Sequence, residues 1–196
     1  PRQITSDGSE TFFSETFGEA FHSRHGASQE AVEKFVLPCQ LPERATSRDR
    51  LCLLDVCYGL GYNSAAALDA IWAVNPKCHV ELYALELNLQ VCEQAATQGL
   101  LSRWRSPVPS LLVALAGARQ LKAPQLEAHL LVGDARQTLP TLHRQGLRAD
   151  GIFFDPFSPP KCPQLWSVEF IALTAACLAP DGYLATYSCA AALQTG

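Results

Sequence analysis

The sequence of 196 residues contains no methionine, no Cys-x-x-Cys pair and no apolar run that approaches the roughly 20 residues needed to cross a bilayer. Without such a run, we expect no membrane-spanning helix and no membrane partner. Without paired cysteines, neither a zinc site nor a thioredoxin-like motif is supported, and we expect no bound metal. A chain that lacks methionine and begins with Pro1 is not the unprocessed product of an initiation codon, so we expect a fragment of a longer protein.

Charge is also scarce, because charged residues make up 17% of the chain and hydrophobic residues 48%. This balance predicts a folded α/β domain and excludes a disordered chain. The net charge of −4 provides no overall attraction to nucleic acid. Residues 101–126 nevertheless carry four basic side chains and no acidic one. They form either an ordinary solvated surface, which we favour, or a contact for phosphates. The four are Arg103, Arg105, Arg119 and Lys122.

Cysteine, by contrast, is frequent, with eight residues. Most of them lie inside apolar runs, as Cys52, Cys57 and Cys92 do, where a reduced cysteine behaves as a small hydrophobic residue. We therefore expect a reducing, cytoplasmic compartment.

The hydrophobic pattern predicts strands that alternate with helices. Residues 38–49 are expected to form a polar connection, and residues 101–126 an irregular insert around one helix. The predicted strands are entirely apolar, which indicates a parallel sheet covered on both faces, in a doubly wound α/β fold. We expect strands at 51–57, 79–85, 128–132, 151–154 and 182–188, and helices at 27–36, 64–74, 88–98, 110–121, 135–144 and 164–178.

Two regions are expected in the chain. Residues 1–26 are predicted to form an N-terminal arm or hairpin, and residues 27–196 the main domain. Because a doubly wound sheet ordinarily continues past its fifth strand, we expect this domain to lack its C-terminal strands.

The clearest motif is a glycine-rich turn between the first predicted strand and its helix, Asp55-Val-Cys-Tyr-Gly-Leu-Gly-Tyr-Asn63. Glycines allow a ligand to approach the backbone closely, and the helix N-terminus offers free N–H groups. The turn departs from the dinucleotide pattern G-x-G-x-x-G, since Cys57 replaces the first glycine. A tight turn of purely structural purpose is the alternative.

Four acidic residues each close one predicted strand, namely Asp55, Glu86, Asp134 and Asp155. Ligands of such sheets bind beyond the carboxyl ends of the strands, so we expect all four in one crevice. Glu86 is placed to accept hydrogen bonds from ribose hydroxyls, or is a surface acid. Asp134 is placed to accept one from an adenine amino group, or to cap the next helix.

Three segments resemble the methyltransferase domain of the MnmC type, which completes the 5-methylaminomethyl group on the wobble uridine of certain tRNAs. They are Thr11 to Ala27, Leu54 to Asn63 and Asp155 to Trp166. The stretch Gly182 to Ser188 is similar to the fifth strand of that family. Asp155-Pro-Phe also resembles the Asp-Pro-Pro-aromatic motif of amino-group methyltransferases.

The resemblance implies a Rossmann-like class I methyltransferase that binds S-adenosyl-L-methionine and acts on tRNA. It places Asp155 beside the aminomethyl nitrogen as the catalytic residue, with Phe157 and Lys161 near the nucleotide. Nothing here is similar to the flavin-dependent oxidase that some bacteria fuse to this domain, so a separate enzyme is expected to supply the aminomethyl intermediate. The implied cofactor-binding residues are Asp55, Tyr58, Gly59, Gly61, Asn63, Glu86 and Asp134.

Two alternatives stay open. One is an aminopropyltransferase related to spermidine synthase, which uses a similar sheet for a small polyamine. The other is a non-catalytic tRNA-binding protein, in which Cys57 has removed cofactor binding. The segment His22 to His25 faces either a phosphate or solvent. The sequence does not predict an oligomeric state.

Overall fold

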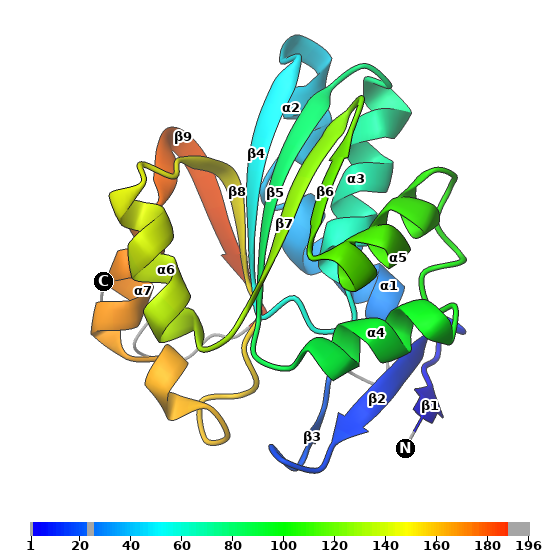
Figure 1. The fold of residues 1–196 in the computed structure, drawn as a ribbon, viewed down its shortest axis with the longest axis vertical. Helices are drawn as coiled ribbons and strands as arrows, with labels where there is room; N and C mark the ends of the chain where they lie inside the picture. Colours follow the sequence, from blue (N-terminus) through cyan, green and yellow to red (C-terminus); the bar gives the residue numbers. More distant parts are fainter. Residues whose placement is uncertain (1, 23–25, 188–196) are drawn as a thin grey trace.

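The computed structural model describes residues 2–22 and 26–187 and contains two β-sheets (Figure 1). The larger sheet has the strand order β6-β7-β5-β4-β8-β9, in which every neighbouring pair is parallel except β6 and β7. The predicted doubly wound, mainly parallel sheet is therefore confirmed. Its strands are β4 (Arg50–Val56), β5 (His79–Glu86), β6 (Gln120–Ala123), β7 (Leu126–Val132), β8 (Ala149–Phe154) and β9 (Leu178–Thr186).

Strand β4 shows why these segments form central strands. Its side chains alternate between two separate cores, with Leu51 and Leu53 packed on one face and Leu54 and Val56 on the other. All four are fully buried, which explains why the sequence is apolar at successive positions. β4 also pairs with β5 on one side and β8 on the other, so the order of the sheet reverses at this strand.

Helices cover both faces of this sheet, as Figure 1 shows. One face is covered by α1 (Ala27–Ala31), a π-helical turn η1 (Val32–Val36), α2 (Leu41–Ser47), α3 (Tyr62–Val74), α4 (Leu89–Thr97) and α5 (Val108–Ala118). On the other side are α6 (Ala135–Arg144), a 3₁₀ turn η2 (Pro163–Leu165) and α7 (Val168–Ala175).

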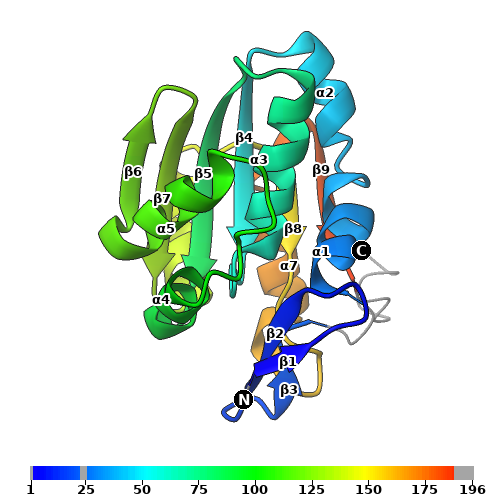
Figure 2. The same cartoon turned by 90° about the vertical axis from the view of Figure 1, so that its right-hand side faces the viewer.

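The N-terminal arm is a small antiparallel sheet of β1 (Arg2–Ile4), β2 (Glu10–Ser14) and β3 (Glu19–Ala20). The arm lies beyond the carboxyl ends of the large sheet, toward which the arrows of β4, β5 and β8 point (Figure 2). These three strands lie within residues 1–26, for which the sequence predicted an arm or hairpin.

Three sequence predictions are wrong in detail. Residues 38–49 contain helix α2, because Pro42 occupies its first turn, where a missing N–H costs nothing. The expected irregular insert includes strand β6, which pairs antiparallel with β7 at the sheet edge. The helix predicted for 164–178 is shorter, because the Ser167 side chain caps it and β9 already begins at Leu178.

In the part of the chain that the structure describes, no helix has both the length and the apolar character required to cross a membrane.

Candidate functional site

A cavity of about 580 Å³ opens at the carboxyl ends of the large sheet, beneath the N-terminal arm. Its volume is in the range of pockets that bury a small-molecule ligand. The wall combines the turn after β4 with the ends of β5, β7, β8 and β9. Side chains of the arm and of the α1–η1 segment complete it. The strand ends contribute Cys57, Tyr58, Gly59, Leu60, Glu86, Asp134, Asp155, Phe157 and Tyr187.

The turn after β4 requires glycine at two places. Gly59 and Gly61 have φ angles of 56° and 83°, in the left-handed region that favours glycine. A Cβ atom at Gly61 would lie 2.5 Å from the Tyr58 hydroxyl, and one at Gly59 would lie 3.2 Å from the ring of Phe21. Cys57 also has a positive φ, 69°, and is therefore strained. A glycine at this position, as in the dinucleotide pattern from which the turn departs, would not carry this strain.

Glu86 ends β5 in the cavity wall and is 8% exposed. Its Oε2 accepts a hydrogen bond of 2.8 Å from the Gly59 amide, and its Oε1 accepts one of 2.9 Å from the Asn88 amide. Burial raises the pKa of Glu86, and these backbone hydrogen bonds oppose the shift. The carboxyl group is held rigidly against the turn, and each oxygen keeps a second lone pair for a ligand.

Asp134 lies in the cavity wall and also caps α6, where its side chain accepts from the Arg136 amide at 2.9 Å. The Arg136 guanidinium donates to both carboxylate oxygens, with Nη2 2.6 Å from Oδ2. This hydrogen bonding lowers the pKa of Asp134. The helix-capping interpretation is therefore confirmed, and a contact with adenine stays a proposal.

Asp155 follows β8, and its Oδ2 accepts a 2.8 Å hydrogen bond from Nδ2 of Asn63 in the first turn of α3. Burial raises the pKa of Asp155 well above its ordinary value, and the neighbouring charge of Asp55 adds to the shift. Asn63 does not itself line the cavity, but it holds in place the carboxyl group of Asp155, which does line it.

Asp55 is not in the cavity wall, which corrects the expectation that four carboxylates share one crevice. It is fully buried beneath the turn, where its Oδ2 accepts a 2.6 Å hydrogen bond from the Ser64 hydroxyl. Burial raises the pKa of Asp55 to about 7. The residue links β4 to the start of α3, because its side chain points into the protein while that of Glu86 points into the cavity.

Phe157 lines the cavity and contacts two aromatic residues of the N-terminal arm. Its ring stacks on Phe17 with centroids 4.6 Å apart, and Phe21 meets it edge-on at 5.1 Å. Lys161 and Gly61, both expected at the site from the resemblance, are not part of the wall. The Nζ atom of Lys161 lies near the arm, 3.3 Å from an ideal Cβ built on Gly18.

Several cavity residues escaped sequence reasoning, since they come from segments distant from the strand ends. The resemblance of segment 11–27 did not say which of its side chains face the site. His22, which the sequence suggested as a contact for phosphate or solvent, lines the cavity, and burial lowers its pKa to about 4, so it is neutral and does not attract phosphate. Arg24 and His25 lie outside the described residues. The others are Phe17, Glu19, Phe21, Glu30, Lys34 and Tyr187.

The basic insert is largely neutralised by acids from other elements. Arg105 donates two hydrogen bonds of 2.8 Å to the carboxylate of Asp69. Arg103 lies 3.6 Å from Asp7, and Lys122 lies 3.6 Å from a glutamate of β7. The interpretation as ordinary paired surface charge accounts for these three residues.

Known proteins resemble this chain over nearly its whole length. Residues 100–196 match the model of a family described as S-adenosyl-L-methionine-dependent methyltransferase. Two curated relatives share the name tRNA 5-methylaminomethyl-2-thiouridine biosynthesis bifunctional protein MnmC. The protein from Azoarcus sp. strain BH72 is 32% identical over 95% of this chain, and that from Aromatoleum aromaticum is 31% identical over 94%. The chain spans 30% of the length of each.

A solved structure agrees with the sequence matches. The crystal structure of MnmC2 from Aquifex aeolicus is 34% identical and superposes with a TM-score of 0.81, covering 96% of this chain and 59% of that one. The chain belongs to this family of S-adenosyl-L-methionine-dependent methyltransferases, with the Rossmann-like class I fold.

Proposed function

We propose that this chain transfers a methyl group from S-adenosyl-L-methionine to the 5-aminomethyl group of a wobble uridine in tRNA. The observation that carries the proposal is Asp155, a carboxyl group fixed by Asn63 in the wall of the cavity, close to the glycine turn. The names of the MnmC relatives support tRNA as the substrate class.

The residues of the cavity suit the cofactor. Gly59 lines the cavity, and Gly61 lets the Tyr58 hydroxyl pack closely against the turn, since a Cβ there would lie 2.5 Å from it. Glu86 offers lone pairs that suit ribose hydroxyls, and Asp134 lies two strands from β4, on the same side as Glu86. Tyr58 completes this wall. We propose that these groups bind S-adenosyl-L-methionine, while Asp55 and Asn63 act from behind the wall.

Asp155 is suited to prepare an amine for attack. The cofactor supplies a methyl group that is already electrophilic, so the chain must align the nitrogen and remove its proton. A primary amine enters mostly as an ammonium ion, whose proton blocks the lone pair. A carboxylate whose pKa is raised by burial is a stronger base than an exposed one. Asp155 accepts the proton and orients the free nitrogen.

The test is methyl transfer by the purified chain to tRNA from cells that lack this gene. We expect labelled methyl groups to appear on the wobble nucleoside, and 5-aminomethyluridine to be converted to 5-methylaminomethyluridine in mass spectra of the digested tRNA. The tRNA must already carry the aminomethyl group, because the proposed reaction adds only the methyl group. Transfer of the aminopropyl group of decarboxylated S-adenosylmethionine to putrescine, with methylthioadenosine released and no RNA present, would instead indicate the aminopropyltransferase. Calorimetry that detects no cofactor binding would indicate the non-catalytic protein.

A further inference from the structure

The aromatic residues of the N-terminal arm have a place in the cavity that the methyl-transfer chemistry does not require. Phe17 and Phe21 belong to the arm, whereas Phe157 follows β8 in the main domain. All three rings line the cavity and are only partly buried, so ring surface stays accessible inside it. The stacked and edge-on contacts described above join them into one wall, here called the aromatic wall.

The aromatic wall lies in the half of the cavity that holds Asp155. Phe157 follows Asp155 by two residues, and the Ser158 hydroxyl donates a 2.6 Å hydrogen bond to Oε2 of Glu19 in the arm. The same half includes Tyr187 at the end of β9, whose hydroxyl donates to the Pro156 carbonyl at 2.9 Å. Glu86 and Asp134 belong to β5 and β7, on the other side of β4. Phe17 and Phe157 are thus separated from the residues proposed to bind the cofactor, whereas the ring of Phe21 lies next to Gly59, at the border of the two halves.

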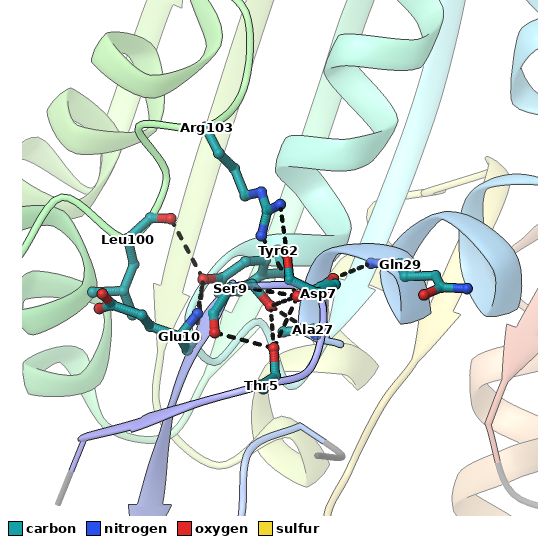
Figure 3. A network of polar contacts seen from close by, with 9 residues as sticks. All are labelled: Thr5, Asp7, Ser9, Glu10, Ala27, Gln29, Tyr62, Leu100 and Arg103. Atoms are coloured by element: carbon teal, nitrogen blue, oxygen red, sulfur yellow. Dashed lines mark hydrogen bonds and ion pairs between the residues drawn. The ribbon is translucent and has the colours of Figure 1, made fainter. Parts of the chain in front are cut away.

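The arm that carries these rings is rigidly attached (Figure 3). The turn between β1 and β2 caps helix α1, because the Ala27 amide donates to the Ser9 hydroxyl at 2.9 Å and the Gln29 amide donates to Asp7 at 3.0 Å. On the other side, the Tyr62 hydroxyl donates to the Glu10 carbonyl at 2.9 Å. A recognition element held by such contacts keeps its side chains in place before a ligand arrives.

The charges beside the aromatic wall select the kind of ligand. Glu19, Glu30 and Asp155 all line this half of the cavity. The positively charged side chain described in this half is Lys34, and its Nζ lies 2.6 Å from Oε1 of Glu30 in an ion pair. An excess of carboxyl groups repels phosphate and favours hydrogen-bond donors and cations. A flat ring that carries an amine therefore fits, and a phosphorylated small molecule does not.

We propose that Phe17 and Phe21, together with Phe157, receive the nucleobase that carries the amine, turned out of its strand. The inference rests on the proposed function and deepens it, since it assigns specificity to the arm. Enzymes that act on a base take it out of the stack and hold it against aromatic side chains. Phosphates of the same nucleotide then stay outside the acidic half of the cavity.

The test measures binding of an anticodon stem–loop RNA that contains one 5-aminomethyluridine, in the presence of S-adenosylhomocysteine. Stacking of a base on an aromatic side chain contributes about 1–3 kcal/mol, so Phe17→Ala and Phe21→Ala should each weaken RNA binding roughly 5- to 150-fold. Calorimetry of Phe17→Ala should give an unchanged Kd for S-adenosyl-L-methionine, because Phe17, unlike Phe21, does not lie next to Gly59. Phe13→Ala is the matched control, because this arm residue is 37% exposed and outside the cavity wall.

A second pair of variants separates stacking from support of the arm. Phe17→Leu keeps an apolar side chain without a ring, and Phe17→Tyr keeps the ring. We expect Leu to bind the RNA as poorly as Ala, and Tyr to bind it nearly as well as the unsubstituted protein. RNA binding by Phe17→Leu equal to that of the unsubstituted protein, or weaker cofactor binding by Phe17→Ala, would overturn the inference while leaving the proposed function standing. If the unsubstituted protein does not bind the RNA, the proposed function fails, and this inference with it.

Discussion

Asn63 and Asp155 are joined by a 2.8 Å hydrogen bond although they are 92 residues apart in sequence. The bond connects the first turn of α3 to the end of β8, and so links the glycine turn to the acid on the opposite side of the switch in strand order. The position of the Asp155 carboxyl group is therefore fixed in part by a side chain from the helix that follows the glycine turn.

Asp155→Asn should abolish methyl transfer while leaving cofactor binding within about threefold. The amide keeps the shape and accepts the hydrogen bond from Asn63, but it accepts no proton. Single-turnover assays with labelled cofactor measure the transfer, and calorimetry measures the Kd. Turnover by the Asn variant at a tenth or more of the normal rate would remove Asp155 from its proposed role.

The rate of transfer should increase with pH through the pKa of Asp155. Because that pKa is raised well above its ordinary value, the carboxyl group still holds its proton in weakly acidic solution and cannot act as a base there. A pH profile of kcat/KM measures the effect. A profile that declines with rising pH across this range would contradict it.

Asp55 should make the protein less stable as the pH rises from about 4 to about 7. Its folded pKa of about 7 exceeds the unfolded value, so the folded protein holds a proton that the unfolded chain releases. The free energy of unfolding then falls by about 1.4 kcal/mol per pH unit in this window and levels off above it. Urea unfolding of Asp55→Asn should lack this slope. Identical slopes in both proteins would show that Asp55 keeps its ordinary pKa.

Cys57→Gly should be tolerated, with stability within about 1 kcal/mol of the unsubstituted protein. The left-handed backbone costs a side-chain-bearing residue about 1–2 kcal/mol, and glycine relieves this strain while adding flexibility to the unfolded chain. Cys92→Gly is the contrasting control, since Cys92 is buried inside α4 and should lose stability measurably in urea. Equal losses in both variants would show that Cys57 is not strained.

Asp7→Ala should destabilise the protein by about 1–3 kcal/mol, because it removes an acceptor for Thr5, Ser9 and Gln29. Burial alone would raise the pKa of Asp7, but these hydrogen bonds more than offset it, and the net pKa is lowered. The stabilisation is therefore present above pH ~4 and is lost as the pH falls below that value. Glu33→Ala, an exposed control, should change stability by less than about 0.5 kcal/mol.

The sequence predicted those parts of the fold and of the site that depend on a local pattern of residues. Strand β4 could be predicted because both its faces are buried, and an apolar run as short as Leu51 to Leu54 is typical of a central strand. Glu86, Asp134 and Asp155 were placed at one cavity because parallel strands end at the same edge. Asp55 was misplaced, since a strand-end residue points either into the cavity or into the core, and sequence spacing does not say which.

Long-range pairing accounts for most of what the sequence did not predict. In the sequence, Arg105 belongs to a group of basic residues with no acidic neighbour. Only the fold shows that Asp69 lies beside it and accepts its hydrogen bond. Strand β6 forms only because β7 offers an edge, and its own four residues carry no strong signal. The position of Phe17 against Phe157 depends on the arm crossing to the end of β8, which no local pattern encodes.

Because the strand order reverses at β4, the two sides of the cavity are built from different portions of the protein. In the proposal above, the donor binds against β4, β5 and β7, and the acceptor against β8, β9 and the arm. We therefore expect substitutions confined to the acceptor side to alter what is methylated without weakening the binding of the methyl donor. An ancestral scaffold of this design can acquire new acceptors by changing one flank and preserving the other.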